Sequence, residues 1–289
     1  MTIWIDMILQ GVLLGGLYAL FATGLSLSFG VMRLVNIAHG DFIVLAAYVG
    51  IVAVDAGLPL IAAPFLAVPL MAALGYVLQR GILNRTLGRG ILPPLLVTFG
   101  LSVIIQNVLL TAFSADSRGL NAGAIEIASL EIGGGVALGW FPLLVLATAV
   151  AVVLGLQILF RHTDMGRAFR AASDDPDTVQ LMGVDNRRIY ATAMAVAMAV
   201  VAVAGFYLAV RTTVAPTIGP SRLLFAFEAV IMGGMGSLWG TLAGGIILGI
   251  SQSVGHHFDP GWGVLAGHLV FLSVLMARPN GMFPRTLDV

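Results

Sequence analysis

Most of this chain consists of apolar runs of about 20 residues, the length that an α-helix needs to cross the hydrocarbon core of a bilayer. Hydrophobic residues make up 59% of the sequence and charged residues only 10%, whereas a soluble domain carries about 25% charged residues. The core of a soluble protein cannot absorb that much apolar surface. The sequence therefore predicts an all-α polytopic integral membrane protein that forms a single transmembrane domain over residues 1–289.

The apolar runs predict about eight or nine transmembrane helices, some of them short or broken. The run at 225–255 is too long for one simple span, and Gly233, Gly234 and Gly236 should break it in two. We expect the remaining spans at residues 7–29, a second one ending near residue 54, and then 60–78, 93–113, 140–160, 189–210 and 264–277.

The arginines indicate how the chain is oriented, because loops rich in arginine stay on the cytoplasmic side of a membrane. Arg80, Arg85 and Arg89 follow the third span, and five further arginines lie in the segment 161–188, two spans later. The loop 114–139 between these two regions is net acidic. We therefore expect both arginine-rich segments in the cytoplasm and the loop 114–139 outside.

Counting spans back from these loops places the N-terminus outside. Its first ten residues contain no basic side chain, so they indicate a retained helix and not a secretory signal. Arg278 and Arg285 indicate a cytoplasmic C-terminus, which requires an odd number of crossings. That number is reached if residues 223–236 form a short helix that dips into the membrane and turns at the glycines.

The strongest concentration of charge in the sequence lies at 161–188, which holds five of the fourteen arginines and five of the fourteen acidic residues. Thr163 or Asp164 can cap a first short helix there. Asp175, followed by a proline, can begin a second helix that Gly183 ends. Two capped helices at the membrane surface indicate a docking element for a cytoplasmic partner. The alternative is a basic loop that only sets the topology.

The chain contains no lysine and no cysteine. The missing lysine excludes a phosphate-binding loop of the usual kind, so we expect no ATP hydrolysis by this chain itself. The missing cysteine excludes disulfides and thiolate chemistry. His256 and His257 have no nearby carboxylate at metal-binding spacing, so we expect no bound metal.

Polar residues interrupt the apolar sequence at two further places. Asn36, His39 and Asp41 lie between the first two spans, and Glu228 precedes the glycine break. Polar groups at membrane depth usually face a cavity or the interior of a helix bundle. The favoured interpretation of residues 36–41 is nevertheless a helix break at the cytoplasmic interface. The candidates for the translocation path are Asn36, His39, Asp41, Glu228, Gly233, Gly234 and Gly236.

Five stretches in collinear order make the chain resemble the shorter permease of branched-chain amino-acid ABC importers. Together they cover nearly the whole sequence. The stretches are GxxxGxxYALxAxGLxLxFG at 11–30, NIAHGDF at 36–42, MGRAFRAASDDPDTVQLMGV at 165–184, GGMGSLWGTLAGGIILG at 233–249 and RPNGMF at 278–283.

The resemblance implies that the segment 161–188 is the coupling loop that contacts an ATPase subunit, with Gly166 as the glycine of the short permease motif of ABC importers. The common Glu-Ala-Ala lead-in of that motif is replaced here by His-Thr-Asp. The candidate coupling residues are Gly166, Arg167, Arg170, Asp174, Asp175 and Gly183.

The resemblance also implies the partners and the location. We expect a second homologous permease, in a heterodimer or alternatively a homodimer. Two cytoplasmic ATPases that use ATP and Mg, and an external or periplasmic substrate-binding protein, complete the expected complex. The chain itself is expected to bind no cofactor and no nucleic acid, and to lie in the lipid bilayer of a bacterial inner membrane.

The implied function is import of branched-chain or other small amino acids. Members of the same family that carry urea, short amides or aromatic acids are the alternative, because selectivity largely resides in the binding protein. A secondary transporter driven by an ion gradient is a weaker alternative, since it would need several deep acidic residues where this chain has essentially Glu228. A membrane enzyme would need a cluster of catalytic side chains that the sequence does not show.

Overall fold

The computed structural model describes residues 2–88, 90–133 and 136–283, and nearly all of its regular structure is α-helical. Within these residues six helical spans are long and apolar enough to cross a membrane. The predicted all-α polytopic fold is thereby confirmed. The long helices are α1 (Thr2–Met32), α3 (Ala63–Gly81), α4 (Leu92–Phe113), α6 (Trp140–His162), α9 (Asn186–Arg211) and α11 (Leu238–Phe258). Three shorter helices pack with them, namely α2 (His39–Asp55), α10 (Gly219–Gly233) and α12 (Trp262–Ala277).

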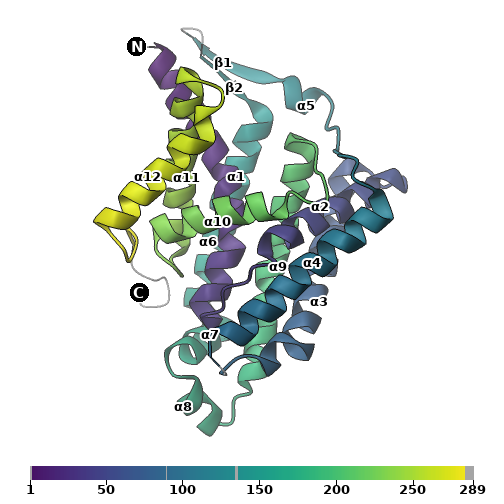
Figure 1. Cartoon of the computed structure of the whole chain (residues 1–289), viewed down its shortest axis with the longest axis vertical. Helices are drawn as coiled ribbons and strands as arrows, with labels where there is room; N and C mark the ends of the chain where they lie inside the picture. Colours follow the sequence, from purple (N-terminus) through teal and green to yellow (C-terminus); the bar gives the residue numbers. More distant parts are fainter. Residues whose placement is uncertain (1, 89, 134–135, 284–289) are drawn as a thin grey trace.

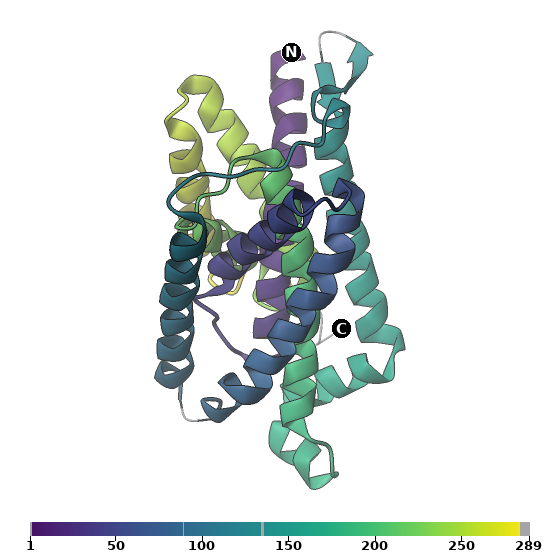
Figure 2. The same ribbon diagram turned by 90° about the vertical axis from the view of Figure 1, so that its right-hand side faces the viewer.

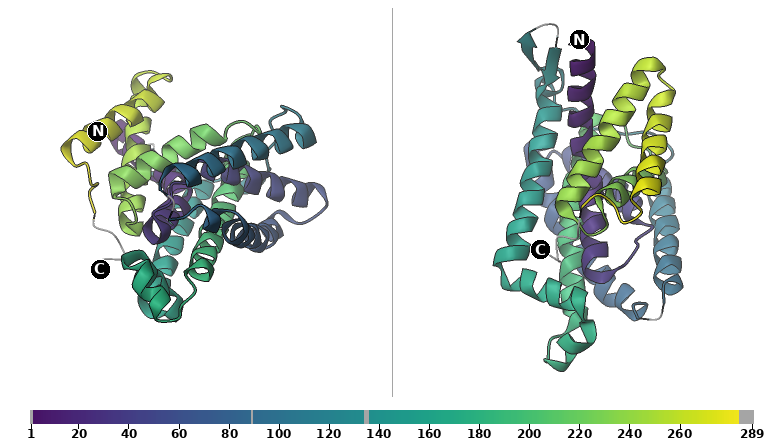
Figure 3. Two further views of the ribbon diagram at one scale, coloured as in Figure 1. Left: turned by 60° about the horizontal axis from the view of Figure 1, so that its bottom comes forward. Right: turned by 90° about the vertical axis from the view of Figure 1, so that its left-hand side faces the viewer.

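The bundle is elongated, and its two ends carry different structures (Figure 1). One end, called the hairpin end below, holds the N-terminus together with α5 (Ala124–Ile127), β1 (Ser129–Gly133) and β2 (Val136–Gly139). The opposite end, called the α7–α8 end, holds α7 (Asp164–Asp174) and α8 (Pro176–Leu181). Figure 3 shows the same two ends from another side.

The segment 114–139, predicted only as a polar loop, contains an antiparallel hairpin in which Ser129 lies opposite Gly139. Pairing the two strands satisfies backbone groups that a loop would leave to water. Leu13 of α1 packs against Val136 and Leu138 of β2, and this contact joins the hairpin to the first helix. Two 3₁₀ turns, Leu60–Ala62 and Leu83–Arg85, flank α3.

Three helices form the centre of the bundle. The apolar windows of α1, α9 and α11 are 83%, 72% and 56% buried, whereas those of the spans around α3, α4 and α6 are 22%, 17% and 28% buried. Glycines let α1 and α11 approach backbone to backbone. A Cβ atom on Gly15 would lie 2.4 Å from the Cα atom of Ile246, and one on Gly249 would lie 2.3 Å from the carbonyl oxygen of Gly11. Small residues at such crossings allow close packing in membranes.

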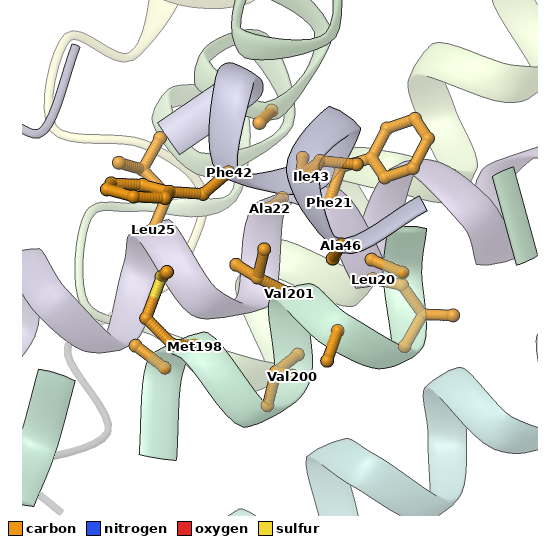
Figure 4. Packing of buried hydrophobic residues seen from close by; sticks show 14 of the residues in the cluster. Leu20, Phe21, Ala22, Leu25, Phe42, Ile43, Ala46, Met198, Val200 and Val201 are labelled. Carbon is orange, nitrogen blue, oxygen red and sulfur yellow. The ribbon is translucent and has the colours of Figure 1, made fainter. Parts of the chain in front are cut away.

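Helix α2 begins halfway along the bundle and not at its end. Helix α1 ends near the α7–α8 end, where Arg33 adopts a positive φ of 50°, and residues 33–38 then return toward the centre as a non-helical segment (Figure 2). The first turns of α2 enter the core between α1 and α9, where Phe42 and Ile43 pack among Leu25, Met198 and Val201 (Figure 4).

Helix α10 runs across the bundle at mid-height in Figure 1, and its second half, from Phe225 to Gly233, is largely buried. The predicted break at the glycines is confirmed, because α10 ends at Gly233 and α11 begins at Leu238. Gly234 and Gly236 have φ values of 107° and 86°, which side chains rarely tolerate. The Ser237 hydroxyl then caps α11 by accepting from the amide of Gly240 at 3.2 Å.

Candidate translocation pathway and coupling surface

Helix α7 folds back tightly against the end of α6. The Thr163 hydroxyl caps α7 by accepting from the amide of Gly166 at 3.1 Å. A Cβ atom on Gly166 would lie 2.2 Å from the carbonyl oxygen of Leu159, so only glycine permits this approach. The Arg170 guanidinium donates to the carbonyl of Phe160, one of the carbonyls left free where α6 ends. Gly166 and Arg170 therefore hold the α6–α7 corner together.

The caps of α8 use the acidic residues that the sequence singled out. The Asp175 carboxylate accepts from the amide of Thr178 at 3.1 Å and from its hydroxyl at 2.5 Å. These bonds, the one from the hydroxyl foremost, hold the pKa of Asp175 below its usual value, so the cap is ionised at neutral pH. Gly183 follows the helix with a φ of 83°. Asp174, at the end of α7, is exposed.

The α7–α8 unit is joined to α1 as well as to α6. The Ser173 hydroxyl donates to the carbonyl of Gly30 at 2.7 Å, and the Arg33 guanidinium donates to the carbonyl of Ser173 at 3.4 Å. Phe169 is 1% exposed and its ring lies 5.7 Å from that of Phe160. A displacement of α7 would therefore reach the end of α1 and the segment 33–38 directly.

The outermost part of this unit is apolar. Leu181 is 89% exposed, Met182 is 78% exposed and Val184 is 40% exposed, at the tip that projects from the α7–α8 end. Arg167 is also exposed and pairs with Asp164, its neighbour one turn earlier. Sequence reasoning chose the charged residues and missed this tip, which we call the apolar tip (Leu181, Met182 and Val184). The available signal was an apolar pair directly before Gly183 in an otherwise polar segment.

Asn36 and His39 do not lie at an interface, so the placement favoured from the sequence is wrong. Both are at most 2% exposed, and His39 Nε2 lies 2.7 Å from the carbonyl oxygen of Phe21, about two thirds of the way along α1. Since a carbonyl only accepts, Nε2 carries the proton. The Asn36 side chain accepts from the amide of Ala38 at 3.1 Å and turns the chain into α2. The discrepancy arises because residues 33–38 re-enter the bundle after α1 has ended.

Asp41 lies where the first turns of α2 and α10 meet. Its carboxylate accepts from the Gln106 amide of α4 at 2.9 Å and is 1% exposed. A Cβ atom on Gly219, the first residue of α10, would lie 2.0 Å from this carboxylate. The N-terminal end of a helix carries partial positive charge. Asp41 thus stabilises the starts of two half-helices inside the bundle, an arrangement typical of sites in transporters.

Glu228 of α10 lies apart from Asp41, and its Oε1 atom contacts Nδ1 of His268 on α12. Nearby, the Tyr18 hydroxyl of α1 donates to Gln252 of α11 at 2.5 Å, and the Phe225 ring lies 5.1 Å from the Tyr18 ring. Sequence reasoning named Glu228 but missed its partner His268 and the bond between Tyr18 and Gln252, because these residues lie on three other helices. Gly233, Gly234 and Gly236 serve the turn that follows α10.

Two cavities open toward opposite ends of the bundle. One, of about 290 Å³, lies among α1, α11 and α12 near the hairpin end and is lined by Gln10, Arg211, Gln252 and His256. The other, of about 280 Å³, lies near the α7–α8 end, where Arg33 and Leu34 of the re-entering segment face Ile91 and Pro94 at the start of α4. Arg89 falls outside the described residues.

The geometry therefore defines a multi-pass membrane protein with half-helices and charged groups inside the bundle and an anchored helix pair at one end. A family model described as "Branched-chain amino acid transport system / permease component" matches residues 7–276. The chain belongs to this family of membrane transport permeases.

Two curated relatives extend over nearly the whole chain. The high-affinity branched-chain amino acid transport system permease protein BraD of Pseudomonas aeruginosa is 28% identical, covering 98% of this chain and 96% of the relative. The corresponding permease protein LivH of Escherichia coli is 29% identical over the same shares. A solved structure, "PsaBC from Streptococcus pneumoniae in complex with Fab", has a TM-score of 0.51 at 15% identity and covers 96% of each chain, which shows similarity of fold.

Proposed function

We propose that this permease is the membrane subunit of an ATP-driven importer for branched-chain or other small amino acids in a bacterial inner membrane. It works with a second homologous permease, two cytoplasmic ATPases that use ATP and Mg, and an external substrate-binding protein. The observation that carries the proposal is the α7–α8 unit. It exposes the apolar tip, while α7 is bound to the ends of α1 and α6. Exposed apolar patches of this kind mark surfaces that bind other proteins.

The proposed orientation places the N-terminus and the hairpin end outside and the α7–α8 end in the cytoplasm. Support comes from the arginines Arg80, Arg85 and Arg161, which lie toward the α7–α8 end, and from the acidic residues Glu126 and Glu131 at the hairpin end. Arg278 marks the cytoplasmic C-terminus in this proposal, whereas Arg285 lies outside the described residues.

Coupling in this proposal follows the contacts of α7. When the ATPases bind ATP, they displace the apolar tip, and the α6–α7 corner moves with it. Ser173 transmits the displacement to Gly30, and Arg33 carries it into the re-entering segment that holds Asn36. The start of α2 then shifts against the start of α10, which opens the path on one side of the membrane and closes it on the other.

The substrate assignment rests on the family and on the relatives, whose names specify branched-chain amino acids. Identifying the ligand of the partner binding protein tests it directly. Calorimetry with the purified binding protein should show tight binding of leucine, isoleucine or valine. Tight binding of urea, a short amide or an aromatic acid instead would reassign the substrate while leaving the transport mechanism in place.

The decisive test of the mechanism is uptake in cells whose ATPase partner carries a substitution of its phosphate-binding lysine. Leucine uptake should fall to the background of a permease-deletion strain, and the protonophore-treated wild type should retain uptake as long as ATP is maintained. Uptake that persists in the ATPase variant and disappears with the proton gradient would establish a secondary transporter in its place.

A further inference from the structure

The cavity of about 290 Å³ near the hairpin end is lined by residues that take no part in the coupling route described above. Four helices supply its walls, namely α1, the end of α9, the last turns of α11 and the start of α12. Figure 3 shows the turn between α11 and α12 at the same end of the molecule as the N-terminus. In the proposed orientation the cavity is therefore at the outer mouth of the permease.

Five polar side chains line this cavity, and three of them are already paired within the protein. The side chains of Gln10, Ser253 and His256 lie 3.0, 2.8 and 3.2 Å from backbone carbonyl oxygens. These bonds hold the walls of the cavity together. The other two polar residues, Arg211 and Gln252, retain donor groups that no group in the described part of the chain accepts.

Gln252 offers one half of its side-chain amide to the cavity. Its Oε1 atom accepts from the Tyr18 hydroxyl at 2.5 Å, so this oxygen is paired and the nitrogen remains. Gln252 is 6% exposed, and its Nε2 atom has no hydrogen-bond partner in the described residues. Buried polar groups in native proteins are nearly always paired. An unpaired amide on a residue that lines a cavity therefore indicates that a bound molecule supplies the acceptor.

Arg211, the last residue of α9, brings a positive charge to the same cavity without an acidic partner. Within residues 2–88, 90–133 and 136–283 its guanidinium forms no ion pair and no hydrogen bond. The acids next to the lining residues in the sequence bond elsewhere, since Asp6 accepts from Gln10 at 3.4 Å and Asp259 accepts from the amide of Gly261 at 2.7 Å. The donors of Arg211 are therefore available to a bound molecule.

These free donors are complementary to a carboxylate. A guanidinium can donate two parallel hydrogen bonds to the two oxygens of a carboxylate, and the amide nitrogen of Gln252 adds a further donor. Leu14 and Val264 supply apolar surface in the same cavity. Its volume approaches the lower end of small-molecule sites, about 300 Å³. A small molecule with one carboxylate and one aliphatic group therefore fits the lining.

We propose that Arg211 and Gln252 form a binding site for the carboxylate of an aliphatic amino acid at the outer mouth of the permease. Leu14 and Val264 contact the aliphatic side chain of the same molecule. This inference rests on the proposed importer function and adds a site to it. The permease then holds the substrate by its carboxylate after the binding protein has released it and before the substrate enters the bundle.

The test uses the purified complex of permease and ATPases without its binding protein. The probe is a photoreactive diazirine analogue of leucine, and mass spectrometry identifies the peptides that it labels. The label should appear on the peptides that contain Leu14 and Val264. Leucine and 4-methylpentanoate, which carry the carboxylate, should protect these peptides, whereas isoamylamine, which carries only the amine, and sodium sulfate should not. Protection by isoamylamine or by sulfate equal to that by 4-methylpentanoate would overturn the carboxylate assignment.

Two substitutions of Arg211 separate its charge from its packing. Arg211→Gln removes the charge and should lower labelling about tenfold or more, because hydrogen bonds to charged groups contribute more than neutral ones. Arg211→Lys keeps the charge but loses the paired donors of the guanidinium, so part of the labelling should remain. Equal loss in both variants would show that Arg211 supports the cavity wall without binding the carboxylate, and the proposal would be wrong.

Gln252→Glu tests the second residue of the site. It keeps an acceptor for the Tyr18 hydroxyl and replaces the free amide nitrogen with an oxygen, so labelling should fall. Unchanged labelling in this variant would overturn the role of Gln252.

The matched control is Arg118→Gln. The backbone of Arg118 pairs with Val214, just beyond the end of α9, so this arginine lies at the same end of the bundle. Its guanidinium differs from that of Arg211 because it lies 3.9 Å from the carboxylate of Asp55. The control should be labelled as strongly as the wild type. Loss of labelling equal to that of Arg211→Gln would show a general effect of removing an arginine at this end, which contradicts a specific site.

The outcome is distinguishable from failure of the importer function. If the wild-type complex hydrolyses ATP faster when loaded binding protein is added, the importer function stands whatever the labelling shows. Labelling that leucine does not compete would then overturn the carboxylate site alone. If binding protein leaves the ATPase rate unchanged and labelling is still competed by leucine, the carboxylate site stands and the importer mechanism fails.

Discussion

The two charged regions of this permease use their polar groups in opposite ways. At the α7–α8 end, Thr163, Asp175 and Arg170 form caps and corner contacts, and the surface they leave for a partner is the apolar tip. Inside the bundle, Glu228 and Gln252 each retain an unpaired polar atom. A charged residue in an exposed segment therefore serves the fold here, whereas an incompletely paired one within the membrane is available for function.

The largest effect is expected from the apolar tip. We expect the double variant Leu181→Asp and Met182→Asp to reduce uptake by more than about 100-fold, because two apolar contacts at the centre of a protein interface contribute about 2 kcal/mol or more each. Both side chains are exposed, so the permease should reach the membrane at normal levels and lose its ATPases during purification.

The matched control for the tip is Ile127→Asp at the hairpin end, where the side chain is 86% exposed. It introduces one negative charge, where the double variant introduces two, on the same kind of surface at the opposite end of the molecule. Co-purification of ATPase should be normal in this control. Equal loss in both variants would mean that the added charge disturbs membrane insertion, and the comparison between the two regions would fail.

A smaller effect on uptake is expected when the α6–α7 corner, which supports the apolar tip, is disturbed. Gly166→Val places a side chain into the backbone of Leu159 and Phe160. Overpacking of this kind costs about 1–3 kcal/mol, so both the melting temperature and the amount of ATPase bound should fall. Gly155→Val, on the neighbouring helix α6 and facing open space, should do neither. Thermal unfolding of the two purified variants measures the difference, and similar curves for both would show that Gly166 is not needed for the fold.

Asp41 provides a prediction for the interior. Asp41→Asn keeps the shape of the side chain but removes the charge that faces the starts of α2 and α10. An acid at a helix start contributes about 0.3–2 kcal/mol, which corresponds to a decrease in uptake of about 30-fold at the upper end. Thr98→Val, nearby on α4, removes a hydroxyl that accepts from Ile37 and is the uncharged control. Unchanged uptake by Asp41→Asn would remove Asp41 from the path.

Features of the fold that depend on neighbouring residues in the sequence could be predicted from the sequence. Features that depend on contacts between distant residues could not. The caps Thr163 and Asp175 and the break after Gly233 are decided by neighbours along the chain. The cap Asp175 and the break were predicted, and Thr163 was one of the two caps predicted for the first helix. The depth of His39 was not, because it depends on a contact with Phe21 that forms only when residues 33–38 turn back into the bundle. The roles predicted for the coupling and path residues remain predictions, which the variants above test.

The smallest effect is expected from Arg167, and it separates two residues that the sequence treats alike. Arg167 is exposed and pairs with Asp164, an exposed ion pair worth about 0–1 kcal/mol. Arg167→Glu should therefore change uptake by no more than about fivefold, whereas Arg170→Glu breaks the bond to Phe160 and should lower the melting temperature as well. Measuring uptake, ATPase stimulation and thermal unfolding of both variants distinguishes a residue that contacts the ATPase from one that holds the α6–α7 corner together. If Arg167→Glu alone uncouples ATP hydrolysis from transport, then charge and not the apolar tip makes the decisive contact, and the contrast between the two regions is reversed.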